Sequence, residues 1–127
     1  MATIINTDKA PAAIGPYVQG VDLGNLVFAS GQIPLDPKTG EMASDITQQT
    51  HQSLANVKAI LTAAGLSAKH IVKTTIFLTD LNDFNTVNGI YEQFFKAVDA
   101  PFPARSCVQV AALPRGANIE IEVIAAR

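Results

Sequence analysis

Two amphipathic segments, residues 45–64 and 80–98, lie on either side of a β-branched stretch at 71–79 that is apolar on both faces. The first segment repeats apolar residues at steps of three and four, opens with an aspartate–glutamine capping pattern and ends before Gly65, so it predicts a helix. The second segment starts at Asp80 and predicts another helix, whose aromatic residues we assign to the core. The stretch between them is typical of a central strand, so this chain is expected to cover a sheet with helices.

Shorter segments predict the remaining strands, at 18–23, 26–30, 104–113 and 118–126, with a possible extra strand at 3–6. Two helices with several strands predict an α+β fold in which the helices cover one face of a single sheet. The turn formers at 114–117 predict that the last two strands form a hairpin. No repeat, low-complexity tract or linker divides the chain, so we expect residues 1–127 to form one domain.

Charged residues are scarce in this chain, at 16% of the total, whereas about 25% is typical of soluble domains. A domain of 127 residues also buries only about two-thirds of the surface that its unfolded chain exposes. A lone chain would therefore leave the second face of its sheet uncovered, and we expect a homo-oligomer. The hydrophobic content of 48% excludes disorder, and the net charge of −2 disfavours a nucleic-acid-binding role.

The cellular location follows from cysteine content and hydropathy. A single cysteine cannot form an intrachain disulfide, which favours a reducing compartment. The first residues lack a basic region followed by a sustained apolar run, and the longest apolar-looking stretch, 23–35, is interrupted by glycine, asparagine, glutamine and proline. We therefore expect a cytoplasmic protein with no membrane segment.

The last two predicted strands carry the side chains with the clearest chemical potential. Alternation along a strand places Arg105 and Cys107 on one face, and Glu120 on the polar face of the next strand. If the register brought these faces together, one surface would hold a guanidinium, a thiol and a carboxylate. Spacing alone favours a simpler interpretation, a solvated edge with an ion pair worth about 0–1 kcal/mol.

Other catalytic patterns are missing from the sequence. His51 and His70 are far apart and neither is close to Cys107 in sequence, so we expect ordinary surface or helix-end histidines. Two histidines and one cysteine provide no metal-ligand spacing, and we expect no metal site. The chain has no P-loop, dinucleotide fingerprint or nucleophile elbow.

Several motifs spread over the chain point to one family. Pro-Ala-Arg-Ser-Cys-Val at 103–108 is followed by Leu-Pro at 113–114 and Ile-Glu-Ile at 119–121. The other matching motifs are Ala-Pro-Ala-Ala-Ile-Gly-Pro-Tyr-Val-Gln-Gly at 10–20, Ser-Gly-Gln-Ile-Pro at 30–34 and Asp-Leu-Asn-Asp-Phe at 80–84. Together they resemble the Rid/YjgF family, whose RidA branch comprises enamine/imine deaminases.

The resemblance implies a fold, an assembly and a reaction. The fold would be chorismate-mutase-like α+β, with two helices on one face of a single mixed sheet, and it would assemble as a homotrimer with ligand clefts between subunits. The reaction would be hydrolysis of 2-iminobutanoate or 2-iminopropanoate to a 2-oxo acid and ammonia, without a cofactor. These imines arise when dehydratases that use pyridoxal phosphate act on threonine or serine, so the implied ligands are small 2-imino or 2-oxo acids.

The resemblance also implies roles for individual residues. Arg105 matches the arginine that holds the substrate carboxylate, and Glu120 matches the acidic residue near the attacking water. The other matching cleft positions are Tyr17, Ser30, Gly31, Asn88, Cys107 and Pro114. Cys107 either takes part in catalysis or lines the cleft, because a covalent role would require a base or a lowered thiol pKa.

Two other functions stay open at the level of sequence. The same cleft would suit a regulatory module that binds 2-oxo acids without turnover, although the presence of Glu120 favours an enzyme. A ribonuclease or translation-inhibitor role is the second alternative, and the acidic charge balance disfavours it.

Overall fold

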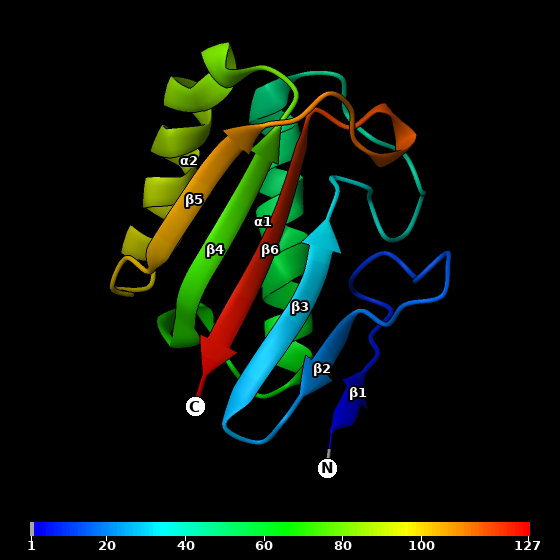
Figure 1. Cartoon of the computed structure of the whole chain (residues 1–127), viewed down its shortest axis with the longest axis vertical. Helices are drawn as coiled ribbons and strands as arrows, with labels where there is room; N and C mark the ends of the chain where they lie inside the picture. The colour runs from blue at the N-terminus through cyan, green and yellow to red at the C-terminus, as the bar shows by residue number, and fades with distance from the viewer. Residues whose placement is uncertain (1) are drawn as a thin grey trace.

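Six strands form one mixed sheet in the order β1-β2-β3-β6-β4-β5 (Figure 1). The structure is a computed structural model that describes residues 2–127. The strands are β1 Thr3–Ile5, β2 Gly20–Asp22, β3 Leu26–Gln32, β4 Ile71–Leu78, β5 Ala104–Gln109 and β6 Ile119–Ala126. Neighbouring strands pair antiparallel, except that β4 and β5 are parallel. The prediction of a single sheet, including the extra N-terminal strand, is confirmed.

Two α-helices, α1 Ile46–Ala63 and α2 Phe84–Lys96, cover the same face of this sheet (Figure 1). The Asp45 side chain accepts a hydrogen bond of 3.1 Å from the Gln48 backbone N–H, as the capping pattern predicts. Gly65 follows the C-cap of α1 with φ +76°, a left-handed conformation that favours glycine. Short 3₁₀ turns complete the chain, at η1 Ala68–His70, η2 Leu81–Asp83 and η3 Pro114–Gly116.

The core lies between the helices and this helix-covered face. Alternate strand residues such as Ile76 and Ile121 pack there against Ile60 of α1 and Phe95 of α2, and all four are fully buried. The opposite side is hereafter the open face. Phe28 of β3 keeps 40% of its surface exposed there, since no helix or strand in the described part of the chain covers it. The expected division into one covered and one open face is confirmed.

The predicted hairpin of the last two strands is wrong. Strand β4 lies between β5 and β6 and pairs with both of them. The chain leaves β4, crosses through α2 and returns as β5 on the outer side of β4, which makes a parallel β-α-β unit. Alternation of residue types shows which face a side chain takes, but it does not identify the neighbouring strand.

No helix within residues 2–127 has both the length and the apolar character required to cross a bilayer.

Candidate active site

Arg105 lies on the edge strand β5, on the helix-covered face beneath α2. Its Nη1 donates a hydrogen bond of 2.6 Å to Oδ1 of Asn88. The guanidinium carbon lies 4.9 Å from the centroid of the Tyr91 ring and 5.4 Å from that of Phe84. Contacts at these distances attract a cation to the ring faces. The guanidinium is therefore fixed in orientation before any ligand arrives.

The aromatic support of this guanidinium is itself held in place. The hydroxyl of Tyr91 and Oγ1 of Thr74 are 2.7 Å apart, and both residues are buried. Burial is the main reason that the pKa of the Tyr91 hydroxyl is raised, so this group is neutral. A cavity of about 380 Å³ opens beside the guanidinium, with Phe102 and Pro103 in its wall. Only one of the five guanidinium N–H groups is used by Asn88, so the others can bind an anion.

Cys107 lies two residues after Arg105, on the same face of β5, and packs partly against the core. Burial raises the pKa of its thiol, and the Arg105 charge offsets this only in part. The thiol is therefore protonated near neutral pH, which disfavours a nucleophilic role. Nδ1 of His70 accepts the Ser67 backbone N–H at 3.1 Å and caps η1, as expected of a helix-end histidine.

Glu120 lies on the open face of β6, opposite Phe77 of β4. Its side chain is half-buried, and burial is the larger cause of its raised pKa, followed by the negative charge of Glu122. No cation pairs with this carboxylate within 4.0 Å in residues 2–127, where the ion pairs are Lys96–Glu92 and Arg127–Asp22. Such a carboxylate holds a proton more tightly than an exposed one.

The interpretation that one surface of the chain unites guanidinium, thiol and carboxylate is wrong for a single chain. Arg105 pairs in register with Thr74, whose side chain meets α2. Glu120 pairs with Phe77, three residues further along β4. Because side chains alternate along a strand, positions separated by three residues point to opposite faces. The sheet therefore separates Arg105 and Cys107 from Glu120.

The remaining predicted residues divide between these two sides and the loops. Ser30 and Gly31 lie at an irregular point of the β3–β6 pairing, and Oγ of Ser30 donates a 2.6 Å hydrogen bond to the Val18 carbonyl. Gly31 is in contact with Glu120 on the open face. Tyr17 lies in the loop before β2 with 49% of its surface exposed, and Pro114 begins η3.

Sequence reasoning assigned Phe84 and Tyr91 only to the core. The structure shows that both also support the Arg105 guanidinium. Their spacing from Asn88, four and three residues, places all three on one face of α2, and this spacing is the signal that could have identified the group. Within the described residues 2–127, no three His, Cys, Asp or Glu side chains come together as they would to hold a metal ion.

Known proteins resemble this chain along nearly all of its length. A family model described as endoribonuclease L-PSP matches residues 7–127. A protein of Salmonella typhimurium named 2-iminobutanoate/2-iminopropanoate deaminase is 64% identical over 127 residues, which covers 100% of this chain and 99% of that protein. The crystal structure of E. coli TdcF with bound serine has a TM-score of 0.97 at 60% identity, and the alignment covers 98% of each chain. That of the E. coli YjgF gene product also has a TM-score of 0.97, at 62% identity and the same coverage.

Proposed function

The chain belongs to the Rid/YjgF family, and from this premise we propose that it is a deaminase of 2-iminobutanoate and 2-iminopropanoate. The observation that carries the proposal is the 64% identity, over the whole chain, to a protein that bears this name. The enzyme hydrolyses the C=N bond of a small 2-imino acid and releases a 2-oxo acid and ammonia. We place it in the cytoplasm, where dehydratases that use pyridoxal phosphate would supply the imine.

Arg105 binds the substrate carboxylate. The N–H groups not used by Asn88 can form two parallel hydrogen bonds to a carboxylate, which fix the direction of the substrate as well as binding it. The rings of Phe84 and Tyr91 keep the planar guanidinium of Arg105 from rotating. A cavity of about 380 Å³ suits a molecule with a short side chain.

The complete site forms between subunits of a homotrimer. Arg105 lies at the free edge of the sheet, whereas Glu120 lies on the open face, so a cleft that contains both requires two chains. The open face is also the surface that a second copy would cover, since Phe28 and Val108 are 40% and 43% exposed there. In this arrangement the β5 edge of one subunit faces the Glu120 surface of its neighbour. Tyr17 and Pro114 line the same cleft from their loops.

Glu120 acts as the base that activates water. The water oxygen forms a bond to the imine carbon while one water proton moves to the Glu120 carboxylate, and Glu120 then passes this proton to the imine nitrogen, which becomes an amine. Glu120 next takes the hydroxyl proton of the tetrahedral intermediate and delivers it to the amine nitrogen, so the carbonyl forms, the C–N bond breaks and ammonia leaves. The raised pKa of Glu120 suits this task, because a base works best when its pKa approaches the ambient pH.

Cys107 lines the cleft and forms no covalent intermediate. Its thiol pKa is raised rather than lowered, and the reaction needs no second nucleophile because water supplies the oxygen of the product.

A dehydratase-coupled assay tests the proposal. A threonine dehydratase generates 2-iminobutanoate, and the release of 2-oxobutanoate is followed with and without the purified chain. The deaminase predicts a release rate that rises in proportion to the amount of chain added, while Glu120→Gln, purified in the same way, adds little. An unchanged rate would instead favour a binding module.

A ribonuclease is the competing function, because the matching family model carries that description. The chain has 9 Lys and Arg residues against 11 Asp and Glu, which does not favour binding to a polyanion. Incubation of labelled RNA with wild type and with Arg105→Lys is expected to leave the RNA intact. RNA cleavage that co-purifies with the chain, and that differs between wild type and Arg105→Lys, would support the ribonuclease.

A further inference from the structure

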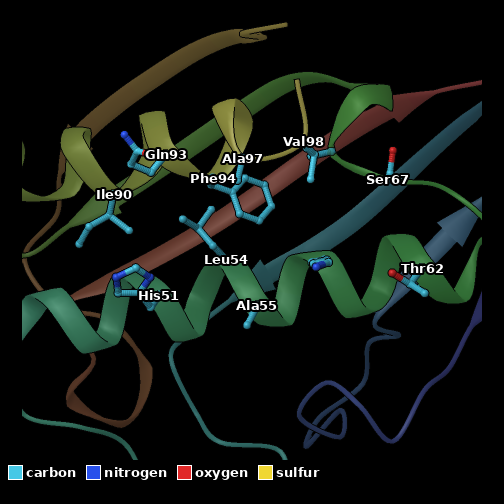
Figure 2. A pocket seen from close by; sticks show the side chains of 12 residues that line it. His51, Leu54, Ala55, Thr62, Ser67, Ile90, Gln93, Phe94, Ala97 and Val98 are labelled. Atoms are coloured by element: carbon cyan, nitrogen blue, oxygen red, sulfur yellow. The ribbon is translucent and has the colours of Figure 1, made fainter. Parts of the chain in front are cut away.

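A groove runs between α1 and α2 on the outer side of the helix layer, away from the sheet (Figure 2). Its volume is about 430 Å³. Leu54 of α1 faces Ile90 and Phe94 of α2 across the floor of the groove, as Figure 2 shows. Leu54 is only 4% exposed, so the floor continues directly into the hydrophobic core.

Small residues are the reason that this space is not filled. Ala55 on α1, Ala97 at the end of α2 and Ser67 before η1 all line the groove. A large side chain at any of these positions would occupy space that the two helices leave open. The groove is therefore built into the sequence of both helices and the turn between α1 and β4.

The rim of the groove carries a cation that no acidic group among residues 2–127 neutralises. Lys58 is exposed on α1, and it belongs to none of the ion pairs found in residues 2–127. No Asp or Glu is among the residues that line the groove, whereas His51 and Gln93 add further polar groups. An apolar floor with a positive rim is complementary to a molecule with an apolar body and one negative end.

We propose that the groove binds a free aliphatic carboxylate of medium chain length. The alkyl chain lies on Leu54, Ile90 and Phe94, and the carboxylate pairs with the ammonium of Lys58. A volume of about 430 Å³ falls in the range of small-molecule sites, about 300–1,000 Å³. A protein partner would require about 800 Å² of matching surface, which favours the small molecule as the occupant.

This site is separate from the candidate active site. Ile90, Phe94 and Ala97 face the groove, whereas Asn88 and Tyr91 turn toward Arg105. The helix therefore lies between the two cavities. The proposal does not rest on the deaminase activity and can be tested by binding alone.

Titration of sodium decanoate into the purified protein tests the site, by calorimetry and by two-dimensional NMR. We expect saturable binding of one decanoate per chain, with the largest shifts at the methyl groups of Leu54, Ile90 and Val98. The cation nonyltrimethylammonium has the same nonyl tail and is expected to bind at least about tenfold more weakly. Equal binding of the two probes, or shifts centred on other residues, would overturn the proposal.

Matched variants separate the groove from general surface effects. Ala55→Phe fills the groove and is expected to abolish decanoate binding, whereas Ala63→Phe, also exposed on α1 but outside the groove, keeps it. Lys58→Glu is expected to weaken binding by about tenfold or more, whereas Lys38→Glu, with the same change of charge in an exposed loop, leaves it within about twofold. Equal affinities within either pair would contradict the assignment.

A second copy of the chain is the other occupant that the experiment can reveal. Light scattering of wild type and Ala55→Phe is expected to give the same oligomeric state, since the proposed ligand is a small molecule. A lower oligomeric state in Ala55→Phe would show that the groove is an interface between copies, and would overturn the proposal.

Discussion

The Glu120 carboxylate lies against the α-carbon of Gly31. A Cβ built on Gly31 would come 2.5 Å from Oε1 and 2.8 Å from the carboxylate carbon of Glu120, closer than real Cβ atoms approach their neighbours. Gly31 occupies the irregular part of the β3–β6 pairing, where the register shifts between Ala29 and Gln32. The absence of a side chain at Gly31 therefore determines where the Glu120 carboxylate can lie.

Gly31→Ala is expected to reduce kcat/KM by about tenfold to a hundredfold, because a misplacement of about 1 Å can cost that much in rate. Gly89→Ala is the control, because a Cβ on Gly89 meets no atom within 4 Å. This helical substitution is expected to keep full activity and to raise the unfolding free energy by about 1 kcal/mol. Steady-state kinetics and thermal melts measure both effects, and wild-type kcat/KM in Gly31→Ala would show that the position of Glu120 is unimportant.

Arg105→Lys is expected to lower kcat/KM by about a hundredfold, mainly through a higher KM. Lysine keeps the charge but loses the planar fork and the stacking on Tyr91 and Phe84. Asn88→Ala is expected to lower kcat/KM by less. The Arg105 guanidinium remains in this variant but loses the hydrogen bond that orients it. Kinetics with 2-iminobutanoate measure the series. Equal activity of Arg105→Lys and wild type would remove Arg105 from substrate binding.

Glu120→Gln is expected to inactivate the enzyme and yet stabilise its fold at neutral pH. Burial and Glu122 raise the pKa of the folded-state Glu120 carboxyl above its ordinary value of 4.5, so ionisation of this group destabilises the folded chain. This loss of unfolding free energy is complete at pH values above the raised pKa of Glu120. It disappears as the pH falls below the pKa of the same carboxyl in the unfolded chain. Chemical denaturation should therefore give Glu120→Gln a higher unfolding free energy than wild type at pH 7. The difference between the two proteins should vanish at about pH 4. A less stable variant at pH 7 would contradict the direction of the pKa shift.

The same pKa predicts how activity depends on pH. The proposed role of Glu120 as the base requires an ionised carboxylate, so kcat/KM is expected to fall as the pH drops through the raised pKa of Glu120. Glu122→Gln removes one of the causes of the raised Glu120 pKa. The fall of kcat/KM on the acid side of the pH profile, the acid limb, should therefore move to lower pH in this variant. Glu41→Gln, an exposed residue of a distant loop, should leave the limb in place. Superimposable limbs for wild type and Glu122→Gln would argue against Glu120 as the titrating base.

Cys107→Ser is expected to retain activity within about threefold if the protonated thiol only lines the cleft, as we propose. Partial packing of this side chain against the core predicts a modest loss of stability, about 1 kcal/mol. Kinetics and denaturation distinguish the two effects. A loss as large as that of Glu120→Gln, in a variant that remains folded, would restore Cys107 as a candidate nucleophile.

Local signals in the sequence predicted the elements of this fold but not their neighbours. Helix α1, expected at residues 45–64 and found at Ile46–Ala63, was predictable because capping and apolar spacing act within one or two turns. The pairing of β5 with β4 depends on the crossover through α2, which no local pattern encodes. The hairpin prediction failed for that reason.

The candidate site shows the same limit. Arg105 and Glu120 could be selected from the motifs around them, and alternation gave the face of each within its own strand. Their placement on opposite sides of the sheet follows from the register of β4, because Thr74 and Phe77 are three residues apart. The roles of Phe84 and Tyr91 depend on how α2 lies over β5, which the sequence pattern does not specify.

Complementation between two inactive variants tests the shared cleft. If Arg105 and Glu120 of one active site come from different subunits, a trimer that mixes Arg105→Ala with Glu120→Gln chains contains some clefts in which both residues are intact. A cleft is intact only when the subunit on one side keeps Arg105 and the subunit on the other side keeps Glu120. Half of the chains keep each residue, so random mixing in equal amounts should restore about a quarter of the wild-type activity. Light scattering checks that both variants form trimers before they are unfolded and refolded together. Activity no higher than that of the separate variants, in trimers shown by mass spectrometry to be mixed, would mean that the two residues do not meet across a subunit boundary.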